Sequence, residues 1–391
     1  MQPMSDSAAM AMPLDGTASA APAGRIALFI PSLNGGGAER VMVSLANGLA
    51  SRNLDVDLVL AREAGVYLND VSRQVRIVGL DASRALGAMW PLARYLRSER
   101  PATLVSAMNY VNVIAHWARR LSGAPTRVVF TEHANLSQLL AASQPLLAWS
   151  LPKLMRPAYA RAHSIIAVSD GVADDLAHTL RIDRPLIHTR HNPIETAALA
   201  AKAREPLDHP WFAPEEPPVI IAAGRLSPEK DFRTLIRAFS LLRRRRPARL
   251  AILGEGGQRA ELQAQIDALE HGRDVLLAGF QTNPYAWMGR AAVFVLSSRW
   301  EGFGNVLVEA MACGTPVVST ACPSGPEEIL EGGRWGRLAA VGDADGLAEA
   351  MDRTLRDEQR PDVRRRAQDF SVDRVVDAYL PLLLPCATAQ Q

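Results

Sequence analysis

The sequence predicts an α/β protein made of two doubly wound parallel-sheet domains that face each other across a cleft. Two observations lead to this fold class. Short apolar segments alternate with amphipathic helical segments along most of the chain, and this alternation is typical of right-handed βαβ units. The alternation stops once, in a polar and proline-rich stretch over residues 194–218, which is typical of a linker between domains.

The first domain is expected over residues 25–193. Its first strand, residues 26–30, is followed by a glycine-rich turn and a helix over about residues 38–50, in which Val41, Leu45 and Leu49 share one face. Residues 1–24 are rich in Ala, Ser, Pro, Met and Gly without periodicity, so we expect a disordered tail. Further strands are predicted at residues 56–60, 75–78, 104–107, 127–131 and 164–168.

The second domain is expected over residues 219–368. A helix near residues 372–384, within a segment 369–385, is expected to cross back onto the first domain and to leave 386–391 as a tail. Parallel sheets bind ligands beyond the carboxyl ends of their strands, so the glycine-rich turns of both domains should point into one interdomain cleft. The strands of this domain are predicted at residues 219–223, 249–253, 275–278, 292–296 and 316–319.

The composition excludes several classes of protein. Hydrophobic residues make up 48% and charged residues 21%, which is ordinary globular composition. The net charge of +2 does not favour nucleic acid as a partner. Three cysteines are too few for a disulfide framework or a zinc site, and a reducing compartment, the cytoplasm, is expected. No run of about 18 apolar residues and no basic leader occurs, so we expect neither a membrane span nor a secretory signal.

The charge is distributed unevenly along the chain. Residues 84–161 carry ten basic and two acidic side chains, which gives this segment +8 and the remainder −6. Within it, residues 146–161 interleave aromatic, aliphatic and basic side chains in the manner of an interfacial anchor. We therefore expect residues 84–161 to attach to an anionic membrane surface. The alternative is a packed helix pair with ordinary solvated arginines.

The most informative motif lies over residues 297–316. A strand ends, Gly302 and Gly304 flank Phe303 in a turn, and a helix of about nine residues follows. Glycines at the start of a helix leave backbone N–H groups open to an anion. Glu301 before the turn and Glu309 in the helix can both face the cleft and accept paired hydrogen bonds from sugar hydroxyls. The alternative is a pair of solvated surface acids.

A second motif, Gly224-Arg225 through Glu229-Lys230, follows the first strand of the second domain. Arg225 and Lys230 lie five residues apart across a turn, a spacing that lets two cations converge on a diphosphate and neutralise a leaving group. The alternative is a charged loop tip.

The remaining sequence features are less specific. The glycine-rich turns at residues 34–37 and 254–257 lack the G-x-G-x-x-G spacing of dinucleotide sites. His133 ends a strand of the first domain and could face the cleft, although a lone histidine is more often structural. Two D-x-D strings, at residues 55–57 and 343–345, are expected to be structural rather than metal-binding.

Taken in order, these motifs resemble the retaining family-4-type glycosyltransferases (glycosyl transferases group 1), which have the GT-B fold of two Rossmann-like domains. The resemblance covers most of residues 25–385 and is strongest over 219–330, where the spacing between Glu301 and Glu309 also matches. It implies a nucleotide sugar as donor, retention of configuration, and no metal or other cofactor.

The resemblance also implies roles for individual residues. Arg225 and Lys230 would bind the donor diphosphate, Glu309 the ribose hydroxyls and Glu301 the hydroxyls of the transferred sugar. His133 would face that sugar. The expected catalytic residues are Arg225, Lys230, Glu301 and His133. The residues expected to bind the donor are Gly35, Gly36, Gly224, Arg225, Lys230, Gly254, Glu255, Phe280, Glu301, Gly302, Phe303, Gly304, Asn305 and Glu309.

Residues 321–330 resemble members that add hexoses or N-acetylhexosamines to lipid-linked or protein-linked glycans. We therefore expect a hexosyltransferase that uses a nucleotide sugar, UDP-linked rather than GDP- or ADP-linked, and a glycan or polyprenyl-diphosphate-linked sugar as acceptor. It would act at the inner face of the cytoplasmic membrane. The alternatives are an isomerase like the UDP-N-acetylglucosamine 2-epimerases and a nucleotide-binding regulator without turnover.

Overall fold

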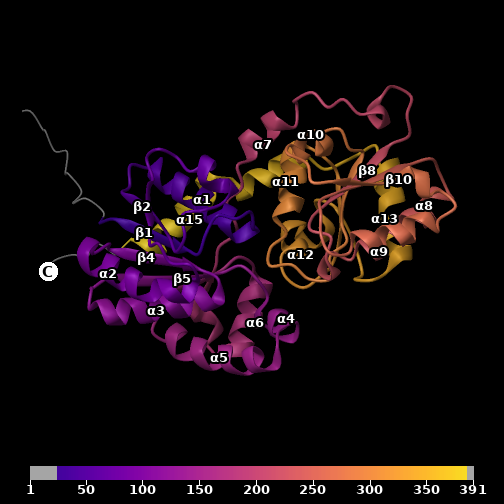
Figure 1. Ribbon diagram of the computed structural model, residues 1–391. Helices are drawn as coiled ribbons and strands as arrows, with labels where there is room; N and C mark the ends of the chain where they lie inside the picture. The colour runs from indigo at the N-terminus through magenta and orange to yellow at the C-terminus, as the bar shows by residue number, and fades with distance from the viewer. Residues whose placement is uncertain (1–23, 385–391) are drawn as a thin grey trace, which may run out of the picture.

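Two parallel β-sheets, one in each half of the chain, confirm the predicted fold class (Figure 1). The computed structural model describes residues 24–384. The two predicted tails, except for Gly24, lie outside the described residues, as does Cys386.

The first sheet has seven strands in the order β3-β2-β1-β4-β5-β6-β7, and every neighbouring pair is parallel. Alternate residues of β1 enter different clusters: Leu28 packs with α1, and Phe29 with α2 and α3. Helices cover both faces, which is why β1 is a wholly apolar run. The elements are β1 Ile26–Ile30, α1 Gly37–Ala50, β2 Val56–Leu60, β3 Arg76–Gly79, α2 Met89–Glu99, β4 Thr103–Ala107, α3 Asn109–Ser122, β5 Arg127–Glu132, α4 Leu136–Ala141, α5 Pro145–Tyr159, β6 Ser164–Ala167, α6 Asp170–Leu180 and β7 Ile187–Thr189.

The second sheet has six strands in the order β10-β9-β8-β11-β12-β13, again all parallel. Leu235 and Phe239 of α8 pack with Leu347 and Met351 of α13 over one face, and α10 and α11 lie with the other cluster. The elements are α7 Thr196–Lys202, β8 Val219–Ala223, α8 Phe232–Arg243, β9 Arg249–Leu253, α9 Arg259–Asp267, β10 Val275–Gly279, α10 Pro284–Met288, β11 Val293–Leu296, α11 Asn305–Cys313, β12 Val317–Thr320, α12 Pro326–Ile329, β13 Arg337–Ala339, α13 Ala344–Arg356, α14 Val363–Ala367 and α15 Val372–Leu383.

Three elements differ from the expectation. β7 and β13 are edge strands of three residues each, and such short segments carry too little periodicity to be recognised. The stretch predicted as a linker contains α7, where Leu199 is buried in the core cluster shared by the two domains. A helix of seven residues has little stability of its own, so this packing is what holds it.

The last described helix, α15, lies beside α1, so the described part of the chain returns to the first domain (Figure 1). Gly48 of α1 allows the close approach, because a methyl group there would overlap the side chains of Val372 and Val376. The guanidinium of Arg52 pairs with Asp377 at 2.8 Å. This crossing ties the second domain to the first at a point away from the linker.

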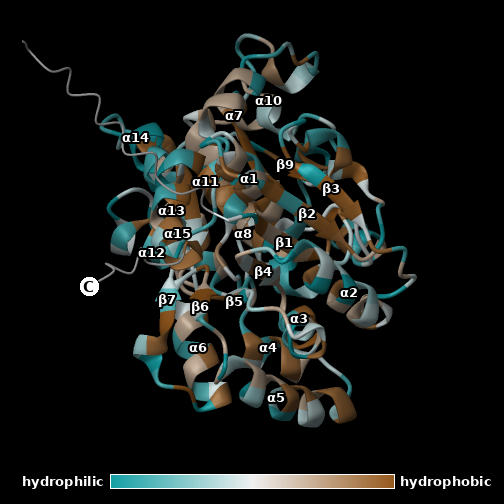
Figure 2. Cartoon of the chain, turned by 90° about the vertical axis from the view of Figure 1, so that its left-hand side faces the viewer, coloured by the Kyte–Doolittle hydropathy of each residue, from teal (hydrophilic) through white to brown (hydrophobic). Residues whose placement is uncertain are grey.

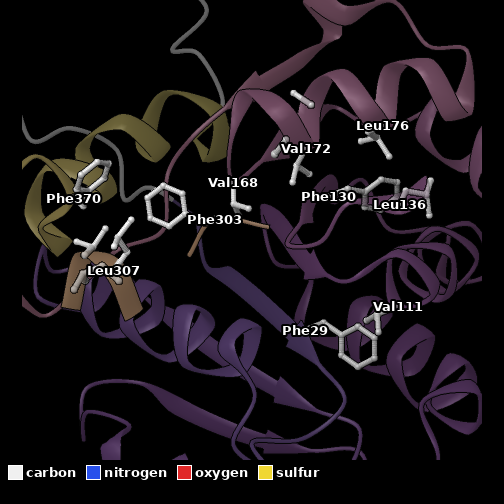
Figure 3. Packing of buried hydrophobic residues seen from close by; sticks show 14 of the residues in the cluster. Phe29, Val111, Phe130, Leu136, Val168, Val172, Leu176, Phe303, Leu307 and Phe370 are labelled. Atoms are coloured by element: carbon white, nitrogen blue, oxygen red, sulfur yellow. The ribbon is translucent and has the colours of Figure 1, made fainter. Parts of the chain in front are cut away.

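Aromatic packing joins the two domains next to the predicted site. Phe303, which follows β11 of the second domain, is fully buried. Its ring stacks on His191 with centroids 5.2 Å apart and lies 5.4 Å from that of Phe370. Figure 3 shows Phe303 between Phe370 and Val168 of the first domain. The turn that carries the predicted site is therefore part of the core.

Candidate active site

A cavity of about 880 Å³ lies between the two domains. Its walls are the segments that follow β1, β4 and β5 in the first domain and β8, β9, β10 and β11 in the second. Ligands of parallel sheets bind at this carboxyl edge. Of the residues predicted to form the site, the cavity is lined by His133, Gly224, Arg225, Lys230, Gly254, Glu255, Phe280, Glu301, Gly302, Phe303, Gly304, Asn305 and Glu309.

The two other predicted residues, Gly35 and Gly36, are not among those that line the cavity, whereas residues 37–40 are. Gly35 has a φ of +112° and Gly36 is the N-cap of α1. A methyl group at Gly37 would lie 3.8 Å from the amide nitrogen of Asn305, at the start of α11. The glycine turn therefore brings the first turn of α1 close to the N-terminus of α11.

An ion pair occupies the centre of the second-domain side. The ammonium of Lys230 donates to Oε1 of Glu301 at 2.6 Å, and the hydroxyl of Ser298 donates to the same oxygen at 2.6 Å. Both charged side chains are largely buried. The group predicted to bind the diphosphate and the group predicted to bind the sugar are thus direct neighbours, which suits the two ends of one glycosyl phosphate bond.

The loop after β8 is fixed to the loop after β11. Asp231 has a left-handed backbone conformation and caps α8, which turns the chain just after Lys230. The hydroxyl of Ser297 donates to the carbonyl oxygen of Lys230 at 2.7 Å. Arg225 on the same loop is exposed, and among residues 24–384 no hydrogen bond or ion pair engages its guanidinium. Lys230 is therefore positioned in advance, and Arg225 is available to an anion.

Gly302 and Gly304 have different structural roles in the turn before α11. A methyl group at Gly302 would overlap the carbonyl oxygen of His133, so this glycine is needed for contact between the domains. Gly304 has a φ of +95° and is the N-cap of α11, a conformation that favours glycine. The first turn of α11 offers backbone N–H groups to the cavity, as the sequence predicts.

His133 is held by a chain of hydrogen bonds. Its Nε2 lies 2.9 Å from the hydroxyl of Thr131, and that hydroxyl donates to the carbonyl oxygen of Ser106. Nε2 must therefore carry the proton that it donates to Thr131. Burial lowers the pKa of His133 to about 4, so the ring is neutral near pH 7. Nδ1 is a buried acceptor without a partner among the described residues.

Glu132, beside His133, was not predicted as a site residue. It lies on the cavity wall but is almost fully buried. The amide of Asn112 donates to it at 3.0 Å, and the hydroxyl of Tyr159 also donates to it. Burial raises the pKa of Glu132 to about 7, although both hydrogen bonds lower it. The sequence shows this residue only as the neighbour of His133.

Arg40 is a further residue that was not predicted. Its guanidinium lies 3.0 Å from Oε1 of Glu309, on the other domain. The negative charge of Glu309 raises the pKa of Arg40, although burial opposes this. Tyr285 lies under the guanidinium, 5.6 Å from Cζ to the ring centroid. Tyr67 and Asn192 also line the cavity.

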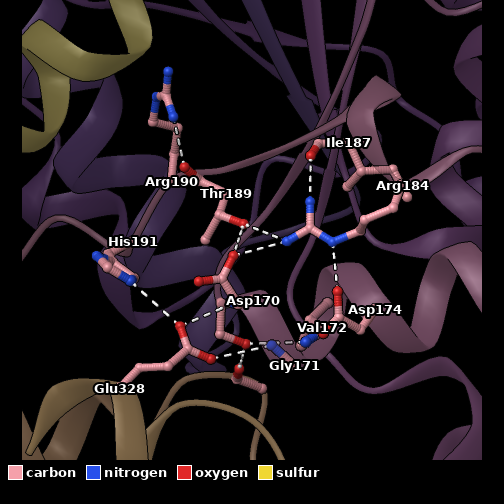
Figure 4. A network of polar contacts seen from close by, with 12 residues as sticks. Asp170, Gly171, Val172, Asp174, Arg184, Ile187, Thr189, Arg190, His191 and Glu328 are labelled. Carbon is pink, nitrogen blue, oxygen red and sulfur yellow. Dashed lines mark hydrogen bonds and ion pairs between the residues drawn. The ribbon is translucent and has the colours of Figure 1, made fainter. Parts of the chain in front are cut away.

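Polar contacts close the far end of the interface between the domains. The carboxylate of Glu328 accepts hydrogen bonds from the N–H groups of Asp170, at 2.9 Å, and Gly171, at 3.1 Å, at the start of α6 (Figure 4). Nε2 of His191 lies 3.5 Å from the same carboxylate. The hydroxyl of Ser169 donates to the carbonyl oxygen of Gly302 at 2.7 Å. An acidic side chain thus caps a helix of the opposite domain.

Both D-x-D strings have structural partners. Asp57 is buried and accepts hydrogen bonds from Arg76 and Tyr95, and Asp343 caps α13. Within residues 24–384, no three His, Cys, Asp or Glu side chains are grouped as metal ligands.

The same arrangement of the two sheets occurs in solved structures. The Anabaena protein HepE, solved in complex with UDP-glucose, superposes with a TM-score of 0.74 at 21% identity over 92% of this chain and all of that chain. The apo form of the lipopolysaccharide outer core galactosyltransferase WaaB gives 0.71 at 18% identity over 92% of this chain and 98% of that one. The fold is therefore the GT-B fold.

Sequence comparisons agree with the fold. Residues 35–198 match the family model Glycosyltransferase Family 4, and residues 204–370 match Glycosyl transferases group 1. The N-acetylgalactosamine-N,N'-diacetylbacillosaminyl-diphospho-undecaprenol 4-alpha-N-acetylgalactosaminyltransferase of Campylobacter jejuni is 28% identical over 92% of this chain and 99% of its own length. The lipopolysaccharide core biosynthesis glycosyltransferase LpsE of Rhizobium meliloti is 28% identical over 89% and 96%. The chain belongs to this family of glycosyltransferases, as the resemblance predicts.

Proposed function

We propose that the protein transfers a hexose or an N-acetylhexosamine from a UDP-linked donor to a lipid-linked glycan, with retention of configuration and without a divalent metal. The observation that carries the proposal is the arrangement of Arg225, Lys230 and Glu301 around one end of the cavity. Two cations and a carboxylate there match the diphosphate and the sugar of a nucleotide sugar.

In this reaction the bond between the anomeric carbon and the diphosphate oxygen breaks. A new bond forms to an acceptor oxygen, whose proton passes to the departing diphosphate or to water. Negative charge grows on the departing diphosphate, where Arg225, Lys230 and the first turn of α11 would stabilise it. Arg225 and Lys230 occupy positions where a metal-dependent enzyme would need acidic side chains to bind its metal ion. Their presence supports a reaction without a metal.

On the sugar side, Glu301 would accept hydrogen bonds from sugar hydroxyls through the oxygen that Lys230 and Ser298 leave free. His133 would lie beside the sugar as a neutral ring, whose Nε2 proton is engaged by Thr131. A neutral imidazole suits a place beside a transition state with positive charge at the anomeric carbon. These contacts orient the sugar relative to the diphosphate.

Support for the UDP donor and the lipid-linked acceptor comes from similar proteins. HepE has been solved with UDP and with UDP-glucose. The Campylobacter jejuni relative is named for action on a diphospho-undecaprenol-linked saccharide. Matches to glycosyltransferase families favour transfer over the epimerase and over the regulator without turnover.

The first domain presents a surface that suits an anionic membrane. None of the ten basic side chains of residues 84–161 has a carboxylate within ion-pair distance in the described part of the chain, and most are exposed. Helices α2, α3 and α5 lie along one side of this domain (Figure 1), and apolar and polar residues alternate along them (Figure 2). The large exposed apolar residues away from the cavity are Trp90, Trp117, Leu121, Leu146, Leu147, Trp149 and Leu154.

We therefore include peripheral attachment to the inner face of the cytoplasmic membrane in the proposal. None of the described helices is long and apolar enough to cross a bilayer. Arginine and lysine beside exposed tryptophan are typical of interfacial attachment, each basic residue near an anionic surface contributing about 1 kcal/mol. Such a surface would bring the cleft to an acceptor carried by a membrane lipid.

The proposal is tested by incubating the protein with a UDP-hexose or UDP-N-acetylhexosamine and a polyprenyl-diphosphate-linked saccharide in the presence of EDTA. Transfer with release of UDP, and an α-linkage from an α-configured donor, would support it. Loss of transfer with EDTA would contradict metal independence. An epimerised donor would support the isomerase, and UDP binding without either product would support the regulator. A panel of UDP-, GDP- and ADP-sugars, with release of the nucleotide as readout, identifies the donor.

A further inference from the structure

A charge pair links the nucleotide side of the cleft to the first domain. Arg40 lies in the first turns of α1, and its Nη1 is 3.0 Å from Oε1 of Glu309 in α11, a residue 269 positions later. The Glu309 side chain is 10% exposed and that of Arg40 is 31% exposed. Both residues line the same cavity. The pair therefore crosses the ligand-binding space itself.

The carboxylate of Glu309 needs a partner at this depth. A buried carboxylate without a compensating charge or hydrogen bond is costly. Arg40 supplies the compensating charge through Oε1. The other oxygen, Oε2, has no hydrogen bond within the described residues and can accept from a ligand. A carboxylate has about four acceptor positions, so a single guanidinium contact leaves capacity for hydroxyl donors.

The surroundings hold Arg40 in this position. The turn at Gly35 and Gly36 brings the start of α1 to within van der Waals reach of Asn305, at the start of α11. The ring of Tyr285 lies against the guanidinium, a contact that restricts the side chain and adds cation–π attraction. Arg40 of the first domain is thus held by two residues of the second domain, Tyr285 and Glu309.

We propose that Arg40 is a positioning residue for the nucleoside of the donor: it holds Glu309 in the orientation that accepts the ribose hydroxyls. This inference rests on the proposed function, which assigns Glu309 to the ribose. Arg40 acts through Glu309 and not on the phosphates, and the ribose is held well only when the two domains are in contact.

The test compares binding of UDP and of 2′,3′-dideoxy-UDP by calorimetry in wild type, Arg40→Gln and Arg40→Lys. Removal of the ribose hydroxyls removes the groups that the oriented Glu309 would bind. We expect Arg40→Gln to weaken UDP binding about tenfold but dideoxy-UDP binding less than twofold, and Arg40→Lys to restore part of the loss. Arg233→Gln, which removes an exposed pair with Glu261 on the second domain, is the matched control and should bind like wild type.

The alternative roles of Arg40 give different results. Equal weakening of UDP and dideoxy-UDP in Arg40→Gln would overturn the inference, because Arg40 would then act on the phosphates or on the fold. Unchanged or tighter binding of UDP would also overturn it. If wild-type protein bound neither nucleotide, the proposed donor would fail and this inference with it. A thermal unfolding curve like that of wild type must accompany each variant.

Discussion

The ammonium of Lys230 lies 2.6 Å from Oε1 of Glu301, so two side chains from different loops of the second domain form one charged unit beside the cavity. A purely structural pair would serve only to neutralise two buried charges. Here Ser298 binds the same carboxylate oxygen and leaves the second one to face a ligand. The pair can therefore neutralise itself in the free protein and engage opposite ends of a glycosyl phosphate during the reaction.

The first prediction concerns this pair. Lys230→Ala should lower kcat/KM by about a hundredfold, because it removes one cation from the departing diphosphate. Glu301→Gln should lower it by about tenfold. The double variant should lose less than the product of the two, since each single change also leaves a buried charge without its partner. Strictly multiplicative losses would show that the two residues act independently.

The second prediction concerns the two ends of the donor. Arg225→Ala and Glu309→Ala should each lower kcat/KM at least tenfold, which corresponds to about 1.4 kcal/mol of transition-state stabilisation. Steady-state kinetics with varied donor measures this. Arg273→Ala is the control, because this exposed arginine precedes β10 at the amino edge of the sheet, away from the cavity. Wild-type kinetics in either cavity variant would contradict the roles assigned to it.

The third prediction is a pH dependence of stability. The pKa of Glu132 is about 7 in the folded protein because burial raises it from 4.5, so the native state holds a proton that the unfolded state releases. The bound proton therefore stabilises the folded state. This contribution to the free energy of unfolding is fully present below pH 4.5 and is lost as the pH rises to about 7. The slope is at most about 1.4 kcal/mol per pH unit.

Urea unfolding of wild type and Glu132→Gln at pH 5, 6 and 7 measures this effect. The free energy of unfolding of wild type should fall relative to that of the variant across this range. His133, whose pKa falls from 6.5 to about 4 on folding, makes stability rise with pH over this range, but both proteins carry it, so its contribution cancels in the comparison. Parallel pH profiles of the two proteins would mean that Glu132 is already ionised at pH 5.

The central strands of both sheets were predicted correctly, and so were two edge strands, β3 and β10. Residues 26–30, 219–223 and 249–253 are wholly apolar or nearly so and are followed by glycine-rich turns, which is sufficient to identify a buried parallel strand. Strands β7 and β13 were missed because each has only three residues, too few to show an apolar pattern. In β7, His188 and Thr189 interrupt the apolar pattern that identifies the central strands.

The site residues also fall into a group that the sequence predicted and a group that it missed. Arg225, Lys230, Glu301 and Glu309 lie in motifs at fixed spacing, so the sequence alone could point to them. The partner of Glu309, Arg40, lies 269 residues away in the sequence, and only the approach of two helix N-termini reveals the contact. Gly302 was correctly placed at the cavity, but its contact with the His133 carbonyl depends on the second domain reaching the first.

The fourth prediction follows from that contact. Gly302→Ala should lower kcat/KM at least tenfold, because the added methyl group would push the turn away from His133 and separate the domains at the cavity. Small-angle scattering should show a larger radius of gyration. Gly257→Ala is the control, since nothing lies within 4 Å of its added methyl group. Full activity and an unchanged radius in Gly302→Ala would show that the interface tolerates the change.

The fifth prediction concerns membrane attachment through α5. Trp149 and Leu154 are 63% and 52% exposed, and Nζ of Lys153 lies 3.3 Å from the centroid of the Trp149 ring. Leu151 and Met155 face the core, so the exposed residues can be changed without opening it. We expect the protein to co-sediment with phosphatidylglycerol vesicles far more than with phosphatidylcholine vesicles, and less so as salt is raised.

The variant Trp149→Ser with Lys153→Gln should reduce binding to the anionic vesicles severalfold, because it removes both an interfacial ring and a charge. Arg244→Gln with Arg245→Gln removes two charges of the basic run at the end of α8 in the second domain and should bind like wild type. Transfer to a short, water-soluble acceptor should be unchanged in the α5 variant, since α5 residues do not line the cavity. Equal binding to neutral and anionic vesicles, or none to either, would rule out electrostatic attachment through this surface.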